Sequence, residues 1–240
     1  MRLAGGLLLL LLMSTASAAQ WPGDQKIPPV NYPTIARQSA TLEGFLPRQW
    51  TLEARAIGDL NGDTRPDAAL VLHMADPRNR ISPSWDPSTK YDTNPRMLIV
   101  AFAKKEGGYE LAAADHKLIP RRENPNQDEP FDEVRIAGGT LRVKMHLFLE
   151  AGGWRMGGSA YTFRWQDGAF RLIGFDRDSI FKNSGETEEI SINYLTGRKL
   201  TKKGNMGSDS EERSAETLPK TKLLALAEIG DGLMFEPGEH

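Results

Sequence analysis

Hydrophobic and polar residues alternate with a period of two along much of this chain. The clearest segment is 141–147, in which Leu141, Val143 and Met145 are separated by Arg142 and Lys144. Such alternation puts every second side chain on one face of a β-sheet. It predicts half-buried strands at 50–57, 134–136, 141–147, 161–165, 170–173 and 190–194. The segments 68–72 and 97–103 are apolar throughout, which predicts strands buried on both faces.

Glycine-containing turns join several of these segments and predict β-hairpins. They are Gly107-Gly108, Gly138-Gly139, Asp167-Gly168 and Thr196-Gly197. No helical periodicity runs longer than about 12 residues. The sequence therefore predicts a mainly β fold, an antiparallel sheet with hairpins and one or two short helices, with an α+β fold as the alternative. One helix is expected within 33–45, and 223–229 predicts either a closing strand or a short helix.

The chain of 240 residues divides into five expected parts. Residues 1–18 have the pattern of a cleaved export signal: Arg2, an apolar run ending at Met13, and Ala16-Ser17-Ala18. Residues 19–32 are rich in proline and predict an extended lead-in, and 33–200 predict the mainly β domain. Residues 201–219 contain few apolar side chains, which predicts a mobile loop or linker. Residues 220–240 predict a C-terminal docking segment and tail.

Composition narrows the class of protein. The chain has no cysteine, which excludes disulfide scaffolds, thiolate metal sites, cysteine nucleophiles and a lipid anchor on cysteine. The net charge of −2 gives no basic surface for a nucleic acid, and no later segment is apolar enough to span a membrane. An export signal without cysteine predicts a periplasmic or secreted protein, most consistent with a bacterial source.

The segment 59–67 contains closely spaced oxygen-bearing side chains. Ca²⁺ takes about six to eight oxygen ligands, and in EF-hand-type loops these come from positions 1, 3, 5, 7 and 9. With Asp59 at position 1, side-chain ligands are Asp59, Asn61, Asp63 and Asp67, and Arg65 supplies a carbonyl. This spacing predicts a Ca²⁺ site. The alternative is a metal-free turn, because Asp and Asn side chains also bond nearby backbone amides.

One position departs from the usual calcium loop. Position 6 is normally glycine, because the chain turns there with a positive φ, and here it is Thr64. Pro66 also restricts Arg65 towards an extended conformation, and no bidentate glutamate stands at position 12.

The residues Gly58–Asp67, followed by Ala68–Leu72, resemble the calcium-loop motif of the FG-GAP and VCBS type. Residues 45–50, 161–165 and 170–174 are similar to segments of uncharacterised exported bacterial proteins that carry one such motif. The resemblance covers about residues 42–175. It implies that the carboxylates bind Ca²⁺ between packed strands, and it implies no particular activity. The motif occurs once, whereas a propeller needs several blades, so no propeller is predicted.

Two loops carry candidate binding residues. The long loop 76–96 contains Trp85 and Tyr91, and the glycine-rich segment 152–158, expected to be a hairpin tip, contains Trp154 and Arg155. Long loops of this kind are frequently functional. The alternative, which we favour for Trp85, is that its side chain attaches the loop to the core.

No nucleophile, metalloprotease or catalytic-triad motif can be read in the sequence. We therefore expect an exported soluble binding or interaction protein of the cell envelope, with the acidic loop as a structural Ca²⁺ site and an envelope protein or polymer as partner. Two alternatives remain open. One is a hydrolase of envelope polymers, and the other is a periplasmic inhibitor or immunity-type protein.

Overall fold

The computed structural model of this chain describes residues 26–151 and 153–237. The predicted signal peptide, residues 19–25 of the lead-in and Gly152 lie outside the described residues. The elements in order are β1 (Gln38–Ser39), a 3₁₀ helix (Leu42–Phe45), β2 (Trp50–Gly58), β3 (Asp67–Met74), a 3₁₀ helix (Pro77–Asn79), β4 (Arg80–Ile81), β5 (Tyr91–Asp92), β6 (Arg96–Ala103), β7 (Tyr109–Asp115), β8 (Phe131–Ala137), β9 (Thr140–Leu147), β10 (Arg155–Gln166), β11 (Ala169–Phe181), β12 (Glu186–Asn193), β13 (Arg198–Asn205), β14 (Ser208–Thr217) and α1 (Leu226–Ile229).

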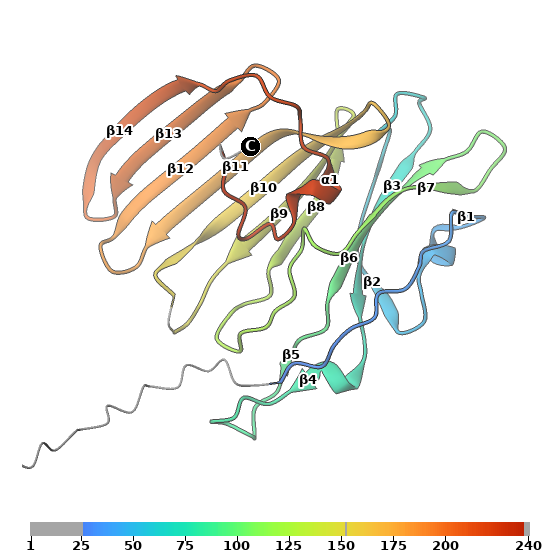
Figure 1. Ribbon diagram of the computed structural model, residues 1–240, viewed down its shortest axis with the longest axis horizontal. Helices are drawn as coiled ribbons and strands as arrows, with labels where there is room; N and C mark the ends of the chain where they lie inside the picture. The colour runs from blue at the N-terminus through green and yellow to red at the C-terminus, as the bar shows by residue number, and fades with distance from the viewer. Residues whose placement is uncertain (1–25, 152, 238–240) are drawn as a thin grey trace, which may run out of the picture.

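The strands form two large antiparallel sheets and one small one (Figure 1). The five-stranded sheet has the order β1-β7-β6-β3-β2, and the seven-stranded sheet is a meander from β8 to β14 in sequence order. The third sheet is the pair β4-β5. The predicted mainly β fold is therefore confirmed, with antiparallel hairpins and one short α-helix.

The five-stranded sheet is buried on both faces at its centre. Ala68–Leu72 in β3 have no exposed surface, and Met97–Ala101 in β6 have at most 2%. One face is covered by the N-terminal segment, through Ile35, Leu42 and Phe45. The other face packs against the seven-stranded sheet. The two wholly apolar segments of the sequence thus form the buried central strands that they predict.

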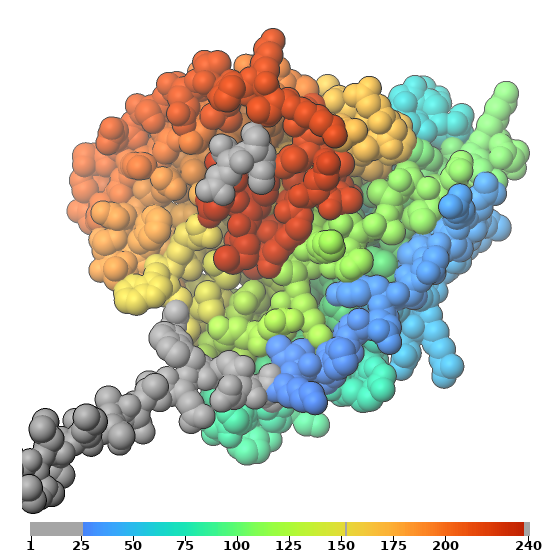
Figure 2. All heavy atoms as spheres, in the orientation of Figure 1, coloured from blue at the N-terminus to red at the C-terminus, as the bar shows by residue number. Residues whose placement is uncertain are grey.

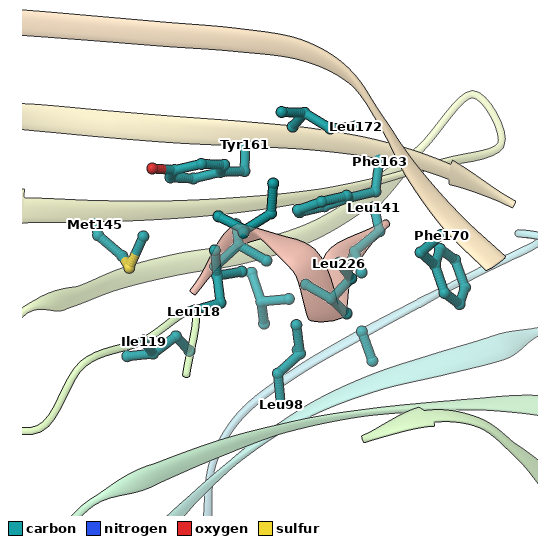
Figure 3. Packing of buried hydrophobic residues seen from close by; sticks show 14 of the residues in the cluster. Leu98, Leu118, Ile119, Leu141, Met145, Tyr161, Phe163, Phe170, Leu172 and Leu226 are labelled. Carbon is teal, nitrogen blue, oxygen red and sulfur yellow. The ribbon is translucent and has the colours of Figure 1, made fainter. Parts of the chain in front are cut away.

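The main core lies between the two sheets and the C-terminal segment. Tyr161, Phe163 and Phe175 of the seven-stranded sheet are fully buried in it. Figure 3 shows Leu226 of α1 between Phe163 on one side and Leu98 on the other. In Figure 2 the C-terminal segment, in red, fills the space between the orange and green parts of the chain. Each such side chain stabilises the fold by about 1.5–3 kcal/mol when fully buried.

The expected loop at 201–219 is wrong, because the chain forms strands there. β13 ends at Asn205 and β14 spans Ser208–Thr217, paired antiparallel. Both faces of β14 are exposed, so no apolar alternation marks it. Cross-strand ion pairs replace the apolar face, with Lys202 Nζ 2.7 Å from Glu211 Oε1 and Lys199 Nζ 2.6 Å from Glu216 Oε1. Charges on such an edge strand also oppose pairing with another chain.

The N-terminal part differs from the expected helix. Gln38–Ser39 pair with β7 as β1, and only Leu42–Phe45 form a 3₁₀ helix. An extended chain covers more of a sheet per residue than a helix does, which suits a segment whose apolar residues are sparse. The lead-in 26–32 has no regular structure, and Arg121 fixes it by donating from a guanidinium N–H to the Pro28 carbonyl at 2.8 Å.

Three other expectations are corrected. The loop 76–96 contains a 3₁₀ helix and the strands β4 and β5. Gly157 and Gly158 lie inside β10 instead of at a hairpin tip, and the strand predicted at 170–173 continues through the polar residues 176–179 as β11. These strands are not recognisable from hydrophobic periodicity, because the face of each strand that meets solvent carries polar side chains. None of the helices in 26–151 and 153–237 has the length and apolar character that a bilayer crossing needs.

Candidate functional site

The acidic loop 59–67 connects β2 to β3, and its backbone curls around the carboxylate of Asp59. Asp59 Oδ1 accepts from the amides of Gly62 at 2.7 Å and Asp63 at 3.2 Å, and Oδ2 accepts from Thr64 N at 2.8 Å. Thr64 has φ of 67° and Gly62 has φ of 83°. The backbone therefore takes the positive φ that position 6 of a calcium loop needs, even though that residue is threonine.

The amides around Asp59 also change its charge equilibrium. The hydrogen bond from the Thr64 amide, with those from Gly62 and Asp63, lowers the pKa of Asp59 below its ordinary value. Hydrogen bonds that favour the ionised carboxylate act in this direction. The loop thus holds one fixed negative charge at its centre.

The second and third expected ligands are engaged with each other. Asn61 Oδ1 accepts from the Asp63 amide at 3.0 Å, and Asn61 Nδ2 donates to Asp63 Oδ2 at 2.9 Å. The Arg65 guanidinium forms an ion pair with the same Asp63 Oδ2 and donates through Nε to the Ala103 carbonyl at 2.8 Å. A cation from the chain itself therefore already neutralises Asp63.

The fourth expected ligand, Asp67, faces the protein interior. It has no exposed surface, Oδ2 accepts from Leu60 N at 2.9 Å, and Oδ1 accepts from Ala103 N at 2.9 Å. Burial is the main cause that raises the pKa of Asp67 above its ordinary value. Its carboxylate thus connects the acidic loop, through Leu60, to the end of β6, through Ala103.

These side chains do not fit a shared Ca²⁺ ion in this arrangement. A calcium site would need about six to eight oxygens directed at one point. Within residues 26–151 and 153–237, no three or more His, Asp or Glu side chains are grouped so that they could hold a metal ion. Asn61 also presents an amide nitrogen to Asp63, and Arg65 covers it. Calcium binding by Asp59, Asn61, Asp63 and Asp67 stays a prediction from the sequence, and the geometry favours the metal-free turn.

The four expected surface residues have different exposures. Trp85 is 53% exposed and Trp154 is 70% exposed, whereas Tyr91 is only 5% exposed. Tyr91 lies beneath the guanidinium of Arg122, 5.6 Å from its ring centre. Tyr91 therefore cannot contact a partner, and Trp85 does not attach its loop to the core. Arg155 begins β10 and pairs with a C-terminal carboxylate, described below.

A concavity lies on the solvent face of the seven-stranded sheet, which is the face turned away from the main core. We call this the outer face. It contains a hollow of about 440 Å³ lined by side chains from β9 to β14. Those six strands would span about 24 Å in a flat sheet, so the hollow crosses most of the sheet. Its charged members are Arg142, Lys144, Asp176, Arg177, Asp178, Glu189, Lys202 and Arg213.

Cross-strand register explains how the outer face is assembled. Lys144 pairs with Ala160, Ala160 with Asp176, Asp176 with Ser191, and Ser191 with Leu200. Residues directly opposite each other in a sheet share a face, so these form one row. The next row runs through Gly158, Asp178, Glu189, Lys202 and Arg213. Small residues in both rows leave the space that the hollow occupies.

The charges on the outer face are arranged in pairs. Arg142 donates to Asp176 Oδ2 at 3.0 Å, and Ser191 Oγ donates to Asp176 Oδ1 at 2.7 Å. Lys202 Nζ lies 3.2 Å from Glu189 Oε1. Hydrogen bonds from Lys202 to Glu211 and then to Glu189 raise the pKa of that lysine. The outer face therefore presents positive and negative charges close together.

This hollow could not be found from the sequence. Arg142 and Lys144 were identified only as solvent-facing members of an alternating strand. Residues 201–219, which include β14 and the second half of β13, were expected to form a loop, so the far side of the hollow had no predicted position. The available signal was the placing of lysines at 199, 202 and 203 and of glutamates at 211, 212 and 216, because opposite charges on two segments can pair across a hairpin.

Comparison of the chain with protein-family models, with curated proteins and with solved structures found no match in any of the three.

Proposed function

We propose that this protein is an exported binding protein of the cell envelope that holds its ligand on the outer face of the seven-stranded sheet. The observation that supports this most is the hollow of about 440 Å³, which crosses six strands and presents paired charges of both signs. Volumes of about 300–1,000 Å³ are typical of ligand sites. The predicted export signal is the reason for placing the ligand in the envelope.

The chemistry of the outer face suits a peptide-bearing polymer. Exposed cations and carboxylates lie close to one another on it, so a ligand with both amines and carboxylates can exchange partners with existing ion pairs. The stem peptides of peptidoglycan carry both groups. An open trough lying across strands also suits an extended chain better than a compact molecule, because it does not enclose its ligand.

Binding is favoured over hydrolysis by how the carboxylates are used. Asp176 accepts from Arg142 and Ser191, and Glu189 pairs with Lys202. These groups build the surface itself. Glycoside hydrolysis needs two carboxyl groups placed on either side of the scissile bond, one of them as an acid.

The acidic loop has a structural part in this proposal. Asp67 and Arg65 join the β2–β3 turn to the end of β6, which keeps the five-stranded sheet as a rigid support. The proposed ligand does not contact the loop.

The test is co-sedimentation of the purified mature protein with isolated peptidoglycan sacculi. We expect saturable retention that weakens as salt is raised, because exposed ion pairs are screened. Ser191→Tyr fills the centre of the hollow and should lower the apparent affinity at least about tenfold, equal to about 1.4 kcal/mol.

The matched control is Ser210→Tyr, which adds the same ring at an exposed position of β14 that does not line the hollow. This control should bind sacculi as the unchanged protein does. Absence of retention for the unchanged protein, or equal loss in both variants, would show the proposed site to be wrong.

A further inference from the structure

Two arginines converge on the inner face of the seven-stranded sheet, opposite the outer face. Arg177 of β11 and Arg155 of β10 project from neighbouring strands towards the C-terminal segment. Arg177 donates to Glu236 Oε2 at 3.1 Å, and Arg155 lies 3.9 Å from Glu236 Oε1. One carboxylate of the tail therefore sits against both guanidinium groups.

The Arg177 side chain is unusual because it is buried without full satisfaction of its donors. It is 10% exposed, and its buried Nε–H has no hydrogen-bond partner among the described residues. Its NH1 group also lies 3.5 Å from the Phe235 carbonyl. A buried charged donor without a hydrogen-bond partner lowers the stability of the fold. Arg177 is therefore a residue that stability alone does not explain.

A small cavity adjoins these arginines. It has a volume of about 10 Å³ and is lined by Arg155, Arg177, Gly157, Ser159 and Ser179, among others. That is about the space of one water molecule. Removing the Glu236 side chain vacates the space beside both guanidinium groups that its carboxylate occupies. A group with two or three oxygens could then reach both guanidinium groups.

Phe235 anchors the C-terminal segment in the core, whereas Glu236 beside it is half exposed. Phe235 is 5% exposed, with its ring centre 5.3 Å from that of Phe175 and 5.6 Å from that of Tyr161. Glu236 is 51% exposed and contacts the arginines only through its carboxylate. The carboxylate can leave while the rest of the C-terminal segment stays packed.

We propose that Arg155 and Arg177 form an oxyanion-binding site for a carboxylate or phosphate group, and that Glu236 occupies this site from within the chain. Guanidinium groups recognise such anions through paired N–H donors. Glu236 acts as a tethered competitor with an effective concentration in the mM range. An external anion binds by displacing it. This site lies on the opposite face of the sheet from the proposed ligand, and Gly158, Ser159, Arg177 and Asp178 border the hollows on both faces.

The test measures anion binding by the full mature protein and by Glu236→Ala. Inorganic phosphate and acetate are titrated separately at constant ionic strength, with chloride as the reference, and the arginine Nε–H signals are followed by NMR. Removal of the competitor should tighten the apparent affinity for one or both anions about tenfold. Which anion gains more identifies the preferred group.

Two controls keep this test specific. Glu216→Ala removes a carboxylate of similar exposure that pairs with Lys199, and it should leave anion affinity unchanged. Adding Arg155→Gln to Glu236→Ala should abolish the gain, with Arg155 being partly exposed and tolerant of change. Equal anion affinity in Glu236→Ala and the unchanged protein would overturn the proposal. So would a gain that survives Arg155→Gln.

Discussion

The guanidinium of Arg96 forms a bidentate pair with the carboxylate of Glu53, donating from Nε to Oε2 at 2.7 Å and from NH2 to Oε1 at 2.8 Å. Arg96 begins β6 and is 3% exposed, and Glu53 lies at the bulge of β2 between Leu52 and Ala54. A bulge redirects a side chain, and here the carboxylate of Glu53 reaches across β3. The third donor of Arg96 contacts Glu129 Oε2 at 2.8 Å. One buried cation thus joins β2, β6 and the loop before β8.

Replacing this cation should destabilise the fold strongly. Arg96→Met removes the cation paired with Glu53 and leaves Glu129 to the Arg122 guanidinium, whose NH1 lies 3.4 Å from Glu129 Oε1. Breaking a buried pair costs about 3–5 kcal/mol. Urea unfolding measures the change. The matched control is Arg80→Met, because Arg80 is 66% exposed and pairs with Asp92 at 3.2 Å. Exposed pairs contribute about 0–1 kcal/mol, so similar losses in both variants would contradict this reading.

The two ends of the acidic loop should respond to pH in opposite directions. The folded pKa of Asp59 is lowered below 3.8, so its ionised form stabilises the fold above that pH, and the contribution is lost as the pH falls through the folded pKa. The folded pKa of Asp67 is raised above 3.8, so ionisation costs stability at neutral pH and acidification relieves that cost.

This difference is measured with Asp59→Asn and Asp67→Asn. The stability advantage of the unchanged protein over Asp59→Asn should shrink as the pH falls below about 4. Its advantage over Asp67→Asn should grow as the pH falls from about 7 towards 4. Urea unfolding across this range gives both slopes. Slopes of the same sign would mean that the two carboxylates are not in the environments described.

Thr64 should be a strained residue. Its φ of 67° is unfavourable for a β-branched side chain, at a cost of about 1–3 kcal/mol. Thr64→Gly should therefore stabilise the protein by about 1 kcal/mol after the added chain entropy is subtracted. Gly62→Ala is the counterpart, since φ is 83° and a Cβ there meets nothing within 4 Å. It should destabilise by about 1 kcal/mol through the backbone alone. Thermal unfolding compares them, and a stability loss in Thr64→Gly would contradict the assignment of strain.

Calcium should have little effect on stability if the loop is closed by its own hydrogen bonds. A site filled at about 100 times its dissociation constant would add about 2.7 kcal/mol, a shift of several degrees in Tm. We expect Ca²⁺, Mg²⁺ and chelator to give the same Tm. A rise that Ca²⁺ alone produces, and that disappears in Asp63→Ala, would show instead that the loop rearranges into a calcium site.

The sequence predicted the elements whose side chains alternate or are wholly apolar, such as β2, β3, β6 and β9. It also placed the turn at Asp167-Gly168, where both residues have positive φ, at 51° and 72°. It missed β14 because that strand is exposed on both faces and is held by backbone pairing and ion pairs such as Lys202–Glu211. Apolar periodicity carries no information about a strand of this kind.

The candidate sites were harder to predict for a similar reason. The spacing of Asp59 to Asp67 gave the correct backbone turn, yet it could not show that Arg65 covers Asp63 or that Asp67 points inward. The outer face depends on the register between β9 and β14, which are far apart in the chain. Tyr91 and Trp85 lie in the same segment 76–96, and only tertiary packing decides that Tyr91, in β5, is buried and Trp85 is exposed.

The most direct test of the proposed function follows the arginine side chains by NMR while a soluble peptidoglycan fragment with its stem peptide is added. We expect the Nε–H signals of Arg142 and Arg213, on the outer face, to shift and saturate, whereas that of buried Arg96 does not move. Absence of any shift with the fragment at up to about 1 mM would contradict the proposed function, because even a weak Kd of about 1 mM corresponds to about 4 kcal/mol of binding free energy. Shifts confined to residues beside Trp85 or Trp154 would contradict it equally, because they would place the ligand on the loops.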